Sequence, residues 1–123
     1  MKIYIIALCL LVTTAFAECT NLFDNGKLVQ STCYPTERTA KNVKNAMFVY
    51  EYGYNSKETL RVTEVVHFKD GTRESITWTS MVYGGTKIVH RYFDKLERLS
   101  DIRYDESTMS MIDLVNETKA LYE

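Results

Sequence analysis

Four aromatic residues occupy every second position of one short stretch, FVYEYGYN, residues 48–55. They are Phe48, Tyr50, Tyr52 and Tyr54. A period of two places side chains on the same face of a β-strand, so the four rings share one side of a sheet. Aliphatic residues fill a dry core best, because each buried hydroxyl must find a hydrogen-bond partner. The tyrosines therefore indicate the wall of a small-molecule pocket or, alternatively, rings at a sheet margin with hydroxyls in water.

The strands that follow predict which residues face this wall. Residues 60–68 and 75–82 alternate in polarity and flank Lys69-Asp70-Gly71, which is typical of a β-hairpin. A three-residue loop with Gly71 in the left-handed conformation places Val62 opposite Trp78 and Glu64 opposite Ile76. A turn at Asn55-Ser56-Lys57 joins this hairpin to the aromatic strand.

A second turn, Tyr83-Gly84-Gly85, extends the meander. A three-residue loop there pairs Trp78 with His90 and Ile76 with Tyr92, whereas a two-residue turn sets Trp78 against Arg91; we favour the first register, which keeps one face largely apolar. The predicted ligand-binding residues are Phe48, Tyr50, Tyr52, Glu64, Trp78, His90 and Tyr92. Glu64 could pair with a cationic group on which the rings stack, so the expected ligand is a small hydrophobic molecule or an amine. In the alternative interpretation, Glu64 faces solvent near a strand end and His90 is an ordinary core or surface residue.

The rest of the chain completes a single β-rich domain, expected over residues 18–123. Further strands are predicted at 28–34, 99–104 and 109–115, with a turn at 105–107, while residues 36–46 form either a loop or a short helix starting at Thr36. The predicted fold is a mainly β, antiparallel up-and-down meander that closes into a small barrel. The alternative is an α+β open antiparallel sheet with one packed helix, formed by residues 36–46.

The N-terminus has the pattern of a secretory signal peptide over residues 1–17. Lys2 precedes an apolar run from Ile3 to Val12, and the small-residue sequence 15–17, Ala-Phe-Ala, supplies a cleavage site. The apolar run is shorter than the roughly 20 residues that span a bilayer, so we expect no membrane anchor. The mature chain should begin at Glu18 and be released as an extracellular protein.

Two cysteines, Cys19 and Cys33, remain after the signal is removed, since Cys9 lies within it. An even pair in an oxidising compartment predicts one disulfide, which would tie an irregular N-terminus to the first strand. The alternative is two free thiols or an intermolecular bridge. Asn116-Glu117-Thr118 is an N-glycosylation sequon, with Asn116 as the acceptor.

Charge and motifs argue against several classes of function. Of 15 basic residues only Lys2 lies in the signal, which leaves 14 against 16 acidic ones. This balance does not favour nucleic acid or anionic lipid as a partner. There is no GxSxG, CxxC or HExxH motif and no phosphate-binding glycine loop. We therefore expect a monomeric protein without enzymatic activity, cofactor or metal.

The stretch 21–28, Asn-Leu-Phe-Asp-Asn-Gly-Lys-Leu, resembles the N-terminal conserved motif of lipocalins, although Gln30 and Thr32 stand where that family has Gly and Trp. The resemblance implies a β-barrel whose open mouth takes a small hydrophobic or amine ligand. It assigns no ligand residues, because the matched motif is structural.

A second hypothesis is a secreted protein-interaction module, such as an effector or inhibitor. The contact surface would be an exposed sheet edge or the outer sheet face, which is predicted to carry Arg61, Lys87, Arg91 and Arg103. A pocket of roughly 300 Å³ or more lined by Tyr50, Tyr52 and Trp78 would favour the ligand-binding hypothesis, whereas an open sheet with a docked helix and no cavity would favour the interaction module.

Overall fold

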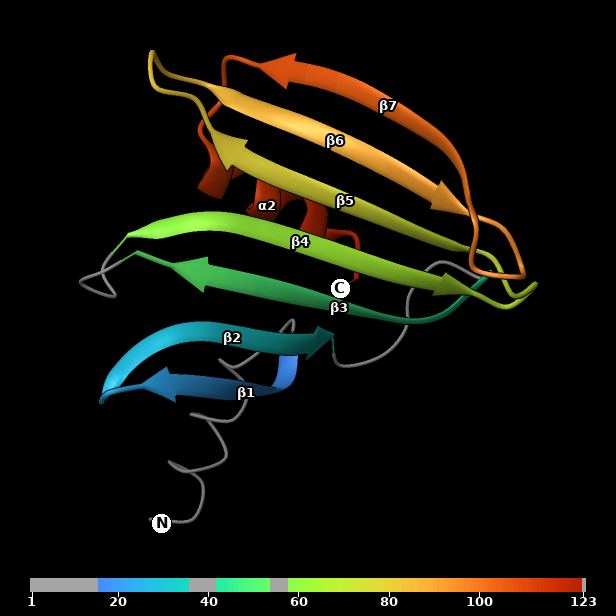
Figure 1. Ribbon diagram of the computed structural model, residues 1–123, viewed down its shortest axis with the longest axis horizontal. Helices are drawn as coiled ribbons and strands as arrows, with labels where there is room; N and C mark the ends of the chain where they lie inside the picture. Colours follow the sequence, from blue (N-terminus) through green and yellow to red (C-terminus); the bar gives the residue numbers. More distant parts are fainter. Residues whose placement is uncertain (1–15, 36–41, 54–57, 123) are drawn as a thin grey trace, which may run out of the picture.

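The computed structural model describes residues 16–35, 42–53 and 58–122 of the chain (Figure 1). Seven strands precede one helix, α2. The strands are β1 (Phe16–Asp24), β2 (Lys27–Pro35), β3 (Val43–Tyr52), β4 (Thr59–Phe68), β5 (Arg73–Ser80), β6 (Thr86–Phe93) and β7 (Leu99–Ser107), and α2 spans Met111–Ala120. Tyr54 and the predicted turn at 55–57 lie outside the described residues.

All seven strands form one antiparallel sheet in the order of the sequence. Among the described strands, β1 pairs only with β2 and β7 only with β6, so the sheet is open and the predicted barrel is wrong. A helix covers one face of this sheet, behind β4 and β5 in Figure 1. The apolar face is therefore buried under the helix rather than by closure of the sheet on itself. The alternative prediction, an open antiparallel sheet with one helix, is confirmed.

The helix lies in a different part of the chain from the predicted one. Residues 43–46 belong to β3, and 36–41 lie outside the described residues. The helix instead replaces the strand predicted at 109–115. Ser110 caps it, because its hydroxyl accepts a hydrogen bond from the backbone N–H of Asp113 at 3.2 Å. Met111 and Val115, four positions apart, share the buried face.

The predicted strand at 99–104 is confirmed, but β7 continues through the supposed turn at 105–107. At the other end of the chain, the strand predicted at 28–34 corresponds to β2. The residues before it are not irregular, since they form β1 and pair with β2 across a two-residue turn. Asn25 and Gly26 in this turn have φ values of 54° and 79°, the left-handed conformation that tight hairpins require.

The β4–β5 register agrees with the prediction, with Val62 opposite Trp78 and Glu64 opposite Ile76. The β5–β6 register does not. Trp78 pairs with Ile88 and Ile76 with His90, a shift of two residues. The turn is a five-residue loop rather than a three-residue one, closed by the Met81 N–H donating to the Gly85 carbonyl at 3.0 Å. A register shift of two residues leaves every side chain on the same face of the sheet. The residues predicted for the inner face therefore still share one face.

The centre of the helix-covered face is an apolar core. It consists of Phe48, Val62, Trp78, Met111 and Val115, each at most 3% exposed. In β3 and β4 every second side chain is buried on this face, and in α2 the buried side chains are four positions apart. The two buried rows face each other, so strand and helix residues form one cluster. This core holds α2 and the residues after it against the sheet.

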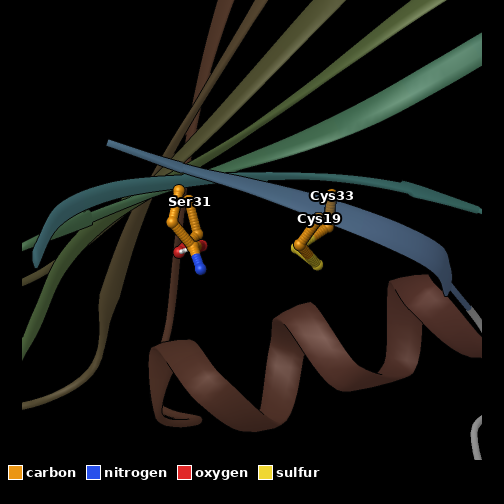
Figure 2. Close-up of a disulfide and its surroundings, with 4 residues drawn as sticks. Cys19, Ser31 and Cys33 are labelled. Carbon is orange, nitrogen blue, oxygen red and sulfur yellow. Dashed lines mark hydrogen bonds between the residues drawn. A yellow bond between two sulfur atoms is a disulfide. The ribbon is translucent and has the colours of Figure 1, made fainter. Parts of the chain in front are cut away.

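A disulfide joins Cys19 to Cys33, as predicted, and connects directly opposite residues of β1 and β2. Its sulfur atoms lie on the helix-covered side of the sheet (Figure 2). Beside it, the Ser31 hydroxyl donates to the Asn21 side-chain oxygen at 2.7 Å. Closing a loop of about 15 residues stabilises the fold by about 3 kcal/mol through the entropy of the unfolded chain.

Candidate functional site

A pocket of about 370 Å³ lies between the helix-covered face of the sheet and the C-terminal end of α2. Its apolar lining consists of Val43, Val66, Ile76, Trp78, Ile88 and Leu121. Its polar lining consists of Glu64, Glu74, His90, Thr118 and Tyr122. The strand residues come from β3 to β6, whereas Thr118, Leu121 and Tyr122 come from the end of α2 and the segment that follows it. Apolar walls with a few polar groups are typical of small-molecule sites.

Three of the predicted site residues line this pocket: Glu64, Trp78 and His90. The other four do not. Phe48 is fully buried in the core, and the partly buried Tyr50 packs against the same cluster. Tyr52 follows a register shift at the end of β3, and Tyr92 lies beyond His90, with the two rings stacked at a centroid distance of 6.3 Å. The aromatic row of β3 is therefore mainly core and margin rather than pocket wall.

Glu64 is the most deeply buried ionisable group of the pocket, with 3% of the residue exposed. The Tyr122 hydroxyl donates a hydrogen bond to Glu64 Oε2. Burial and, to a smaller extent, the negative charge of Glu74 raise the pKa of Glu64 to about 7, against the opposing effect of the hydrogen bond from Tyr122. Burial, followed by that hydrogen bond, raises the pKa of Tyr122. Glu64 thus changes its charge close to neutral pH.

Glu74 and His90 form the second polar pair. His90 Nδ1 lies 3.2 Å from Glu74 Oε2, and both side chains are largely buried. Next to them, Arg103 of β7 donates to the Tyr92 hydroxyl at 2.6 Å and lies over its ring. Arg103 was predicted on the outer face, but it lies opposite His90, on the same side of the sheet as the pocket. The positive charge of Arg103 is thereby placed at the margin of the site.

Sequence reasoning missed the residues that close the pocket, namely Thr118, Leu121 and Tyr122. Their spacing of three and four positions is a helical signal, but residues 109–115 had been interpreted as a strand. Glu74 was missed although it continues the alternation of Ile76 and Trp78. Extending that alternation by one step would have placed it on the inner face.

The opposite face of the sheet carries Arg61, Lys87 and Arg91, as predicted. These side chains alternate with the inward-facing Val62, Ile88 and His90. Arg61 forms a bidentate ion pair with Glu51, with N to O distances of 2.9 and 2.7 Å. In residues 16–35, 42–53 and 58–122, no second helix packs on this face.

Within the described part of the chain, no group of three or more His, Cys, Asp or Glu residues is arranged to hold a metal ion. None of the described helices is both long enough and apolar enough to cross a membrane. No protein-family model matches the chain, and no curated protein or solved structure is significantly similar to it.

Proposed function

We propose that this is a secreted protein that binds a small, mainly apolar molecule in the pocket between the sheet and the end of α2. The observation that carries the proposal is the pocket itself. Its volume of about 370 Å³ lies within the range of roughly 300 to 1,000 Å³ typical of small-molecule sites, and aliphatic and aromatic side chains form most of its wall.

The position of the pocket supports this proposal. Its floor consists of paired strands, whose side chains are held by the sheet, while one wall follows the end of the helix. Leu121, in that wall, is 77% exposed, so ligand access beside it requires little rearrangement. As a lipocalin does, the protein would hold its ligand against an antiparallel meander, but under a helix rather than inside a barrel.

Secretion rests on the signal-like residues 1–17 and is supported by the disulfide, because such bonds persist in oxidising compartments. Cleavage after Ala17 would fall within β1 and remove only the Phe16–Pro35 pair from the β1–β2 register. Cys19 would remain. Asn116 lies exposed on α2, where a glycan would not disturb the core.

The test is native mass spectrometry of the protein secreted from eukaryotic cells, combined with a binding titration of N-phenyl-1-naphthylamine, a probe that is uncharged at neutral pH. A retained small molecule, or saturable probe fluorescence, is expected. Ile88→Phe should fill the pocket and abolish probe binding. Lys87→Phe changes the next residue of β6, on the opposite face, and should leave binding intact. Equal binding by both variants, or none by the wild-type protein, would refute the proposal.

A second candidate function is contact with an acidic protein through the opposite face of the sheet. The observation that favours it is the set of basic side chains on that face, of which Lys87 and Arg91 lie on the same strand. In this case, Lys87→Glu with Arg91→Glu should weaken the interaction of the secreted protein with its target, whereas Ile88→Phe should not. The reverse result would favour the pocket.

A further inference from the structure

Glu64 is a buried carboxylate that forms no ion pair with a described Lys or Arg residue. Its hydrogen-bond partner, the Tyr122 hydroxyl, is neutral. A buried carboxylate normally has a cationic partner, because its desolvation is costly. Since Glu64 lines the pocket, the natural place for such a cation is the pocket itself.

A second carboxylate lies close to the first. Glu64 is opposite Ile76 and Glu74 is opposite Val66, so the two acids are diagonal neighbours on β4 and β5. Diagonal pairs on one face are roughly 7 to 8 Å apart at the backbone, which leaves both carboxylates within reach of one ammonium group. Both acids line the same pocket.

The end of α2 adds negative potential from the opposite side. Thr118, Leu121 and Tyr122 belong to the last turn and the residues after it, where the partial charge of a helix is about −0.5. Trp78 and Tyr122 supply aromatic rings to the same cavity, and such rings attract cations. Acids, helix end and rings thus favour the same kind of ligand charge.

The basic groups around the pocket act on Glu74 rather than on Glu64. His90, from β6, is the basic residue that lines it, and it contacts Glu74 rather than Glu64. Lys119 of α2 lies over the Tyr50 ring of β3, with Nζ 5.6 Å from the ring centre. Arg103 of β7 lies over the Tyr92 ring, at the margin, and its charge interacts favourably with that of Glu74. None of the described Lys or Arg residues lines the pocket.

We propose that the ligand is a protonated primary or secondary amine carried on an apolar or aromatic body, with its ammonium group between Glu64 and Glu74. This inference rests on the proposed ligand-binding function and specifies its ligand class. The apolar body would lie against Trp78, Ile76 and Ile88, and the ammonium would donate to both carboxylates. Because the pKa of Glu64 is raised to about 7 by burial, amine affinity should increase as the pH rises through neutrality.

Two probes of the same size test this inference: 2-(1-naphthyl)ethylamine and its neutral counterpart 2-(1-naphthyl)ethanol. Isothermal titration calorimetry at pH 8 should show the amine binding at least about tenfold more tightly than the alcohol, since charge-assisted hydrogen bonds are the stronger ones. At pH 5.5 the preference should fall severalfold. Glu64→Gln should remove most of the preference for the amine, together with the pH dependence of that preference, without lowering the affinity for the alcohol. Glu117→Gln, on the exposed side of α2, is the matched control and should change neither.

The outcomes separate the two proposals. Equal affinity for amine and alcohol at pH 8, or an unchanged preference in Glu64→Gln, would overturn the amine inference and leave the apolar pocket standing. No binding of either probe, together with no binding of N-phenyl-1-naphthylamine, would overturn the proposed function as well.

Discussion

The two ends of the helix-covered face differ sharply in composition. Met111 and Val115 of α2 form one cluster with Val62 and Phe48, all nearly inaccessible to solvent, and Phe48 is where this cluster meets the polar end, since it lies opposite Glu64 and against the Tyr122 ring. Beyond the last turn, the same sheet presents carboxylates, a histidine and a cavity. One end has the composition of a core and the other that of a binding site. Stability and ligand binding should therefore respond to different substitutions, although one helix covers both regions.

The largest effect is expected in the core. Phe48→Ala removes a side chain with no exposed surface and should destabilise the protein by about 3 to 5 kcal/mol. Urea unfolding followed by circular dichroism would measure the change. A loss below about 1 kcal/mol would mean that the packed end is not the main source of stability.

The second effect concerns the polar end and depends on pH. The folded pKa of Glu64, about 7, lies above its usual value of 4.5, so its contribution to stability is full below pH 4.5 and is lost as the pH rises through 7. Between pH 5 and 8.5 the wild-type protein should lose about 2 to 3 kcal/mol more than Glu64→Gln does. Urea titrations of both proteins at both pH values would measure this difference. Equal losses of stability in the two proteins would mean that the Glu64 carboxyl group is solvated rather than buried.

A smaller effect is expected from Tyr122→Phe. Without the hydroxyl, the buried Glu64 carboxylate loses its hydrogen-bond donor, at a cost of about 1 to 3 kcal/mol above pH 7. Below pH 5 the carboxyl group is neutral and the cost should be smaller. Thermal unfolding at pH 5 and pH 8.5 distinguishes this result from a simple packing defect, which would be the same at both.

The smallest effect is expected from Tyr50→Phe. The Tyr50 hydroxyl is buried and has no hydrogen-bond partner among the described residues, and burial raises its pKa to about 12. Removing it should change stability by less than about 0.5 kcal/mol or increase it slightly. A clear loss, measured in the same unfolding assay, would indicate a polar contact at this position.

The alternation of inward and outward residues made the strands of the sheet predictable. The capping residue of α2 did not make the helix predictable in the same way. Glu64, Trp78 and His90 could be assigned to one face because a period of two fixes the face even when the register slips by two. The turn after Ser80 was misjudged because a glycine pair permits several loop lengths. Sequence could not decide between core and pocket for Phe48 and Tyr50, since that depends on where α2 and Tyr122 pack on the sheet.

The missed elements had local signals that weak competing patterns obscured. Asn25-Gly26 is a strong two-residue turn signal, but it was interpreted only as part of a family-like motif, so β1 was not foreseen. Ser110 followed by Asp113 is a helix start, yet the short apolar run 111–115 suits a strand equally well. The pocket required both the helix and the strand register, so its full lining was beyond local patterns.

The position of α2 after all seven strands bears on how the molecule folds. Each strand pairs with its neighbours in sequence, so the hairpins can form early and in order as the chain is synthesised. The core side of the sheet stays open to solvent until residues 111–122 are in place. A nascent or truncated chain lacking that segment would expose Phe48, Val62 and Trp78 together, a surface that chaperones bind and that favours aggregation.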